Sequence, residues 1–148
     1  MAIYFYSTRG DYGSFSNFSA HSFELDGEYW PTTEHYFQAQ KFPATPQVDR
    51  IRQAKTPKDA AKMGRDRSLP LRSDWEQVKD EIMKKAVLRK FETHGEIREI
   101  LLATGDEEIV ENSPIDYYWG CGKDGSGKNM LGQILMEVRE ILRSRTPD

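Results

Sequence analysis

The sequence has too few cysteines and histidines for two common kinds of small domain. Cys121 is the only cysteine among 148 residues, so no internal disulfide can form. A reducing, cytoplasmic setting fits best. The histidines, His21, His35 and His94, show no metal-ligand spacing, and one cysteine adds little to them. A structural zinc site would lack most of its usual ligands. We therefore expect no bound metal.

Long apolar runs and a basic excess are also missing. No apolar run approaches the roughly 20 residues that cross a bilayer, and the chain begins MAIYFY, without the regions of a signal peptide. Lysine and arginine total 21 against 24 aspartates and glutamates, a net charge of −3. We therefore expect no membrane association and no generic nucleic-acid binding, which normally requires an excess of positive charge. A local basic cleft remains possible.

The hydrophobic pattern predicts one domain over residues 1–148, a compact, mostly helical α+β fold with a small antiparallel β element. A strand is predicted over 3–6 and a hairpin over 22–30 with its turn at Asp26-Gly27, so that residues 1–30 form the β element. A short strand is also predicted over 108–111. Helices are predicted over about 31–42, 46–54, 57–64, 74–91 (capped by Ser73), 96–104 and from 129 onward.

The segment WPTTEHYFQAQKF over residues 30–42 has a composition unlike that of a plain amphipathic helix. At about 100° per residue, Glu34, Gln38 and Lys41 fall on one face. Glu34 is expected in the first turn and Lys41 in the last turn, before Pro43 ends the helix. This face is either a solvated surface with a favourable charge at each end or the wall of a cleft. The aromatic residues around it favour the cleft.

A basic loop follows the helix predicted to end at residue 64. Arg65, Arg67 and Arg72 crowd this loop in an otherwise acidic chain. Two interpretations remain open. The arginines are either solvated or form a site for a phosphate or pyrophosphate, whose paired oxygens match guanidinium geometry. Trp75 begins the next helix, where its ring could stack on a ligand.

A glycine-rich loop, GKDGSGKN over 122–129, nearly matches the phosphate-binding loop of nucleotide hydrolases. It lacks the final serine or threonine that would bind magnesium, and the chain lacks the alternating strands and helices of that fold. We therefore do not expect a nucleotide hydrolase. A loop whose backbone amides surround some other anionic ligand remains possible.

The functional groups of these segments suit the cleavage of a glycosidic bond. A carboxylate can stabilise the cationic sugar or activate water, while a second group assists departure of the leaving group. Glu34 and Lys41, Asp116 beside Trp119, and Trp75 beside the arginines supply such groups. Periodicity alone does not show that these residues meet in space.

The chain resembles the NADAR family, in particular its N-glycosidase members. The resemblance is carried by FSNF at 15–18, DGEYWPTTEHYFQAQKF at 26–42, AAKMGRDRSLPLRSDWEQVK at 60–79, DYYWGCGKDGSGKNMLG at 116–132 and LMEVRE at 135–140. It implies a mostly helical α+β domain that hydrolyses N-glycosidic bonds with neither metal nor cofactor. The implied substrates are phosphoribosylamino-pyrimidine intermediates of riboflavin synthesis, releasing ribose 5-phosphate. The alternatives are an ADP-ribosyl hydrolase acting on nucleobases and a non-catalytic module that binds ADP-ribose.

The resemblance also implies which residues act. Glu34, Trp75 and Asp116 fall at active-site positions, and Lys41 is a further catalytic candidate. Glu34 would be the carboxylate at the anomeric carbon and Asp116 the acid or the group that positions water. Lys41 would bind phosphate or ribose hydroxyls, or trap an opened sugar as a Schiff base. The expected substrate-binding residues are Trp75, Trp119, Arg9, Asn17, Arg65 and Asn129.

Overall fold

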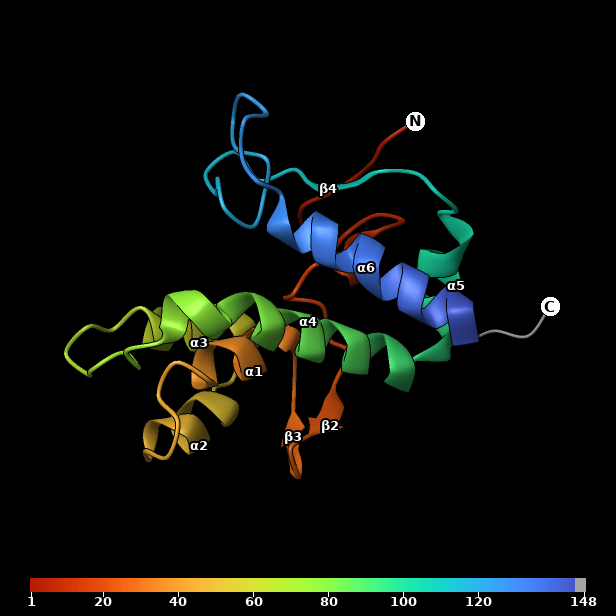
Figure 1. Ribbon diagram of the computed structural model, residues 1–148. Coiled ribbons are helices and arrows are strands. Elements are labelled where there is room, and N and C mark those ends of the chain that lie inside the picture. The colour runs from red at the N-terminus through yellow and green to blue at the C-terminus, as the bar shows by residue number, and fades with distance from the viewer. Residues whose placement is uncertain (146–148) are drawn as a thin grey trace.

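A computed structural model describes residues 1–145 and confirms a mostly helical α+β fold (Figure 1). No helix described in that range is long and apolar enough to cross a membrane. The helices are α1 Thr33–Ala39, α2 Gln47–Arg52, α3 Pro57–Gly64, α4 Trp75–Thr93, α5 Gly95–Ala103 and α6 Met130–Arg145. The strands are β1 Ile3–Phe5, β2 Phe23–Leu25, β3 Glu28–Trp30 and β4 Ile109–Glu111.

The hairpin is confirmed, but the first strand does not belong to it. Strands β2 and β3 pair antiparallel, and the turn residues Asp26 and Gly27 have φ values of 55° and 80°, as a two-residue hairpin turn requires. Strand β1 instead pairs in parallel with β4, with Ile3 opposite Ile109. The prediction that residues 1–30 form one β element is therefore wrong. The sequence pattern of a strand does not indicate which other strand it pairs with, and β4 lies far from β1 in the sequence.

Helix α1 lies between two hydrophobic clusters formed by residues 1–145. Tyr36 and Ala39 pack with the hairpin, α2 and α3, whereas Phe37 packs with α4, α6 and the β1–β4 pair. All the residues of α1 are buried. Its remaining face carries Glu34 and Gln38, which belong to neither cluster but are buried all the same. The interpretation of that face as solvated surface is therefore wrong.

Several helix ends differ from the predicted ones. Helix α1 begins after Thr32, whose side chain accepts a hydrogen bond from the His35 amide, but it ends at Ala39. Lys41 therefore lies beyond the helix instead of in its last turn. Helix α4 begins at Trp75 with Asp74 as its N-cap, and no side chain caps it, so the prediction of Ser73 as the cap is wrong.

Helix α4 connects the two halves of the fold, with α1 on one side and α6 on the other (Figure 1). Its buried residues Met83, Val87 and Phe91 belong to the larger cluster. Lys90 is also buried, and its ammonium donates to the carbonyls of Ser14 and Ser16, at 3.0 Å for Ser16. This contact ties α4 to the loop that precedes the hairpin.

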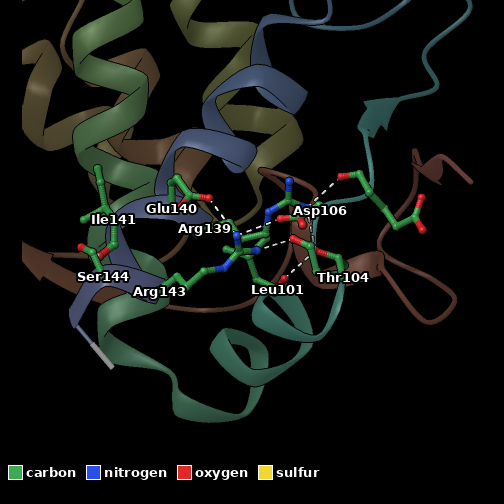
Figure 2. A network of polar contacts seen from close by, with 10 residues as sticks. Leu101, Thr104, Asp106, Arg139, Glu140, Ile141, Arg143 and Ser144 are labelled. Atoms are coloured by element: carbon green, nitrogen blue, oxygen red, sulfur yellow. Dashed lines mark hydrogen bonds and ion pairs between the residues drawn. The ribbon is translucent and has the colours of Figure 1, made fainter. Parts of the chain in front are cut away.

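Polar contacts fix the position of β4 relative to α6 (Figure 2). Arg139 of α6 donates to the Thr104 hydroxyl at 3.0 Å and to the Glu107 carbonyl at 2.8 Å. Arg143 donates to Asp106 at 2.9 Å. These donors reach the turn between α5 and β4, and therefore hold the strand that ends at Glu111.

Candidate active site

A cavity of about 690 Å³ opens where α1, α3 and α4 meet the loops at residues 6–8, 16–18 and 111–119. This size and the mixture of apolar and polar walls are typical of small-molecule sites. No group of three or more His, Cys, Asp or Glu side chains in residues 1–145 is arranged to hold a metal ion. Most of the predicted site residues line this cavity, namely Glu34, Lys41, Asn17, Arg65, Trp75, Asp116 and Trp119.

Glu34 is a buried carboxylate on the cavity wall. Its Oε2 accepts a hydrogen bond of 2.7 Å from Gln38 Nε2, one helical turn later. Burial raises the pKa of Glu34, which the Gln38 hydrogen bond, Lys41 and Arg65 oppose and Asp116 reinforces. Such a carboxyl can accept a proton near neutral pH more readily than an exposed glutamate.

Asp116 is held by the backbone of its own loop. Its Oδ1 accepts hydrogen bonds from the amides of Tyr118 at 2.9 Å and Trp119 at 2.8 Å. Its own amide donates to the Ser113 hydroxyl at 3.1 Å. An aspartate that bonds the amides two and three residues ahead forms a tight local turn. The turn fixes both the carboxylate and the start of the segment that carries Trp119.

Glu111 is a third carboxyl in the cavity, and no functional role was predicted for it from the sequence. Burial raises the pKa of Glu111 to about 7, with further increases from Asp116 and Glu34. These carboxyls are therefore close enough to influence one another. A strand pattern over 108–111 does not tell which glutamate faces a cavity, so only the three-dimensional structure could reveal Glu111.

Cations occupy other parts of the cavity wall. Burial and the nearby Arg67 lower the pKa of Lys41 to about 8, although Glu34 opposes this. The Lys41 ammonium lies 5.7 Å from the ring centroid of Trp75 and 3.4 Å from the Gly64 carbonyl oxygen. Arg65 lines the cavity without a side-chain hydrogen bond or ion pair to any residue in the described range. It is therefore free to meet an anionic ligand.

Only part of the basic loop faces the cavity. Arg72 pairs with Asp74 at 2.6 Å, and Arg67 donates to the Gly64 carbonyl at 2.8 Å. Lys79 also lines the cavity, although no role was predicted for it. It follows Trp75 by one helical turn and precedes Met83 by another, and this i, i+4 spacing is a signal that could have identified it.

Aromatic rings form the apolar part of the wall. Trp75 is 6% exposed and its ring centroid lies 5.0 Å from that of Phe37, whereas Trp119 is partly exposed and meets Phe37 edge-on at 5.3 Å. Phe18 and Ile115 line the cavity while remaining 39% and 81% exposed. These surfaces suit the flat face of a heterocyclic base.

Two buried amide oxygens have no hydrogen-bond donor within the described residues. They are Asn17 Oδ1 and Gln38 Oε1, and both residues line the cavity. A buried acceptor without a donor is unfavourable in the free protein. Hydroxyl groups of a sugar would supply the missing donors.

The glycine-rich loop does not surround an anion with its amides. The amides of residues 127–131 donate instead to carbonyls of the preceding segment, for example Lys128 to Tyr117 at 2.9 Å and Leu131 to Trp119 at 3.1 Å. The Asn129 amide likewise donates to the Gly120 carbonyl at 3.0 Å. The prediction that this loop could bind an anion through these amides is therefore wrong. Its hydrogen bonds fix the segment that holds Asp116 and Trp119.

Two predicted residues lie outside the cavity. Arg9 is exposed and does not line it. The Asn129 side chain is engaged with β4, donating to the Ile109 carbonyl at 2.9 Å and accepting from the Glu111 amide at 2.9 Å. Asn129 therefore positions Glu111 from outside the cavity.

Comparisons with known proteins agree with this fold. The family model described as NADAR domain matches residues 4–143. The chain is 55% identical over 140 residues to the N-glycosidase YbiA of Escherichia coli, covering 95% of this chain and 88% of that protein. The NMR structure of E. coli YbiA matches with a TM-score of 0.90 at 53% identity, covering 97% of this chain and 86% of that one. The chain is also 42% identical over 160 residues to a maize riboflavin biosynthesis protein, PYRR, covering 98% of this chain and 26% of that protein. The chain therefore belongs to the NADAR family.

Proposed function

We propose that this protein is an N-glycosidase that hydrolyses the bond between a nitrogen base and a phosphorylated ribose. The activity follows from its relationship to proteins named N-glycosidase. The preferred substrates are phosphoribosylamino-pyrimidines of riboflavin synthesis, because related maize and Vibrio vulnificus proteins are named riboflavin biosynthesis proteins. The observation that carries the proposal is the buried Glu34 carboxylate in a cavity that also contains cations and rings.

The reaction develops positive charge on the sugar as the base departs. Glu34 stabilises that charge and accepts a proton from the attacking water. Asp116, fixed by the amides of Tyr118 and Trp119, orients the water. A site for passive binding of a phosphorylated ligand would gain little from buried carboxylates, because they repel phosphate and are costly to bury. Their presence favours catalysis over a binding module.

The remaining residues hold the two ends of the substrate. Lys41 and Arg65 bind the phosphate, and Trp75 and Trp119 contact the base. Asn17 and Gln38 accept hydrogen bonds from the ribose hydroxyls, which satisfies their unpaired oxygens. Binding through these remote groups orients the anomeric carbon near Glu34, and such orientation contributes strongly to rate.

The test uses purified protein, a phosphoribosylamino-pyrimidine and, in parallel, a guanine oligonucleotide carrying ADP-ribose. Mass spectrometry follows release of ribose 5-phosphate and of ADP-ribose. We expect ribose 5-phosphate to be released and the Glu34→Gln variant to lose at least about 100-fold in kcat. The control is Glu24→Gln, an exposed glutamate on β2 outside the cavity.

Each other outcome contradicts a specific part of the proposal. Release of ADP-ribose alone would replace the proposed substrate with an ADP-ribosylated base. Saturable binding without any product would favour the binding module. Wild-type activity in a folded Glu34→Gln variant would remove Glu34 from the mechanism.

A further inference from the structure

The backbone around Glu111 is held rigidly at the cavity edge. Its amide donates to Asn129 Oδ1 at 2.9 Å, and its carbonyl accepts from the Cys121 amide at 2.9 Å. Gly120 packs so closely that an added Cβ would lie 3.0 Å from the Glu111 carbonyl oxygen. Glu111 also pairs with Phe5 in the parallel β1–β4 ladder. The side chain therefore enters the cavity from a fixed point.

The Glu111 carboxyl has fewer hydrogen-bond donors around it than the carboxyls of Glu34 and Asp116. Glu34 accepts from Gln38, and Asp116 accepts from two backbone amides. No donor and no ion-pair partner within residues 1–145 reaches the Glu111 carboxyl, although it lines the same cavity. The charges that act on it are those of Glu34 and Asp116, which have the same sign as its own ionised form. When carboxyls share a site in this way, the proton stays on the one with the least support for its charge.

We infer that Glu111 is the general acid of the reaction and donates its proton to the departing base nitrogen. This inference rests on the proposed N-glycosidase function. As the bond between C1 and nitrogen breaks, its electron pair goes to nitrogen, which takes the proton of Glu111. Water adds to C1 and gives a proton to Glu34. Transfer of that proton to solvent and reprotonation of Glu111 restore the starting state, so the net change is addition of water across the bond.

A general acid matters only when the leaving group needs a proton. The experiment therefore compares two substrates with the same ribose 5-phosphate, one bearing the aminopyrimidine and one bearing 4-nitrophenol, which departs as a stable anion. Each is assayed with the wild-type protein, Glu111→Gln, Glu111→Asp and the control Glu108→Gln. Glu108 is exposed, lies three residues earlier and does not line this cavity. Thermal unfolding confirms that each variant is folded.

We expect Glu111→Gln to lower kcat on the aminopyrimidine by about 100- to 10,000-fold while changing the nitrophenyl rate by less than about fivefold. Wild-type kcat/KM for the aminopyrimidine should fall above about pH 7, where Glu111 loses its proton. In Glu111→Gln this fall should be absent, and kcat/KM should decline only above about pH 8, where Lys41 loses its charge. Compared with Glu111→Gln, the Glu111→Asp variant should recover part of the rate on the aminopyrimidine and the fall in kcat/KM above about pH 7. Equal loss on both substrates, or no loss on either, would overturn the inference. A wild-type protein inactive on both substrates would instead refute the proposed function.

Discussion

Replacing Gly64 with alanine should disturb Glu34 through Gln38. Gly64 is the last residue of α3, and a Cβ there would lie 1.9 Å from Gln38 Oε1 and 2.6 Å from its Cδ. Ordinary contacts between heavy atoms are about 3.5 Å, so the amide must move by about 1.5 Å. The Gln38 Cβ would be 3.0 Å away, a contact that a backbone shift of a few tenths of an ångström relieves, whereas the larger clash with the amide requires rotation of the side chain. Such rotation breaks the 2.7 Å hydrogen bond to Glu34.

The loss of that hydrogen bond sets the size of the effect. A hydrogen bond to a charged group contributes about 1.5–3 kcal/mol. The hydrogen bond supports the ionised form, so its loss should raise the already raised pKa of Glu34 further. A free energy of about 1.4 kcal/mol corresponds to a factor of ten. Glu34 must be ionised to act as a base. The acidic limb of the profile of kcat/KM against pH should therefore move to higher pH, and the rate on its slope should fall about 10- to 100-fold.

The assay is a double-mutant cycle on kcat/KM with Gly64→Ala, Gln38→Ala and the double variant. In the Gln38→Ala background there is no amide to displace, so Gly64→Ala should have almost no further effect. The matched control is Gly95→Ala on α5, where a Cβ would meet only the flexible Arg98 side chain, at 3.3 Å. Additive losses in the cycle, or an unchanged acidic limb in Gly64→Ala, would refute the reasoning.

Two further predictions concern lysines. Lys41, with a pKa of about 8, should lose its charge above that pH, so KM for a phosphorylated substrate should rise about tenfold per pH unit. Lys41→Arg keeps the charge and should remove this rise; a parallel rise in the variant would exclude Lys41 from phosphate binding. Lys90→Met removes the ammonium's hydrogen bonds to the Ser14 and Ser16 carbonyls, which keep only their bonds from Ser19, and should lower the free energy of unfolding by about 2–4 kcal/mol in urea titrations. The exposed Lys58→Met should change it by less than about 0.5 kcal/mol, and a similarly small loss in Lys90→Met would contradict the assigned role.

The parts of the fold that local chemistry determines were predictable from the sequence. The Asp26-Gly27 turn needs residues that tolerate positive φ, and the start of α1 needs a capping hydroxyl such as that of Thr32. The spacing of Glu34 and Gln38 likewise predicted a shared face, which the 2.7 Å hydrogen bond between them confirms. Each of these features depends on residues within one turn of one another.

The parts that depend on distant partners were not predictable. The parallel pairing of β1 with β4 joins residues 3–5 to residues 109–111, and it is this pairing that brings Glu111 to the cavity. The glycine-rich loop was predicted as a possible anion site because its glycines and lysine nearly match the spacing of a phosphate-binding loop. The acceptors of its amides are the carbonyls of residues 117–121, which become available only when that segment folds back over the start of α6.

The polar groups that line the cavity lower the stability of the free protein, and the same groups stabilise the transition state of the reaction. Glu34 is buried and Glu111 is half-buried near Asp116, so ionising all three carboxyls would bring like charges together in a poorly solvated space, and two amide oxygens lack donors within the described residues. A neutral base and ribose relieve little of this repulsion. The sugar acquires positive charge only as the bond to nitrogen breaks, and carboxylates around it then become stabilising. Lys41 and Arg65 meanwhile hold the phosphate, whose charge does not change during the reaction. The carboxylates therefore act mainly on the transition state, and the cations act equally on substrate and transition state.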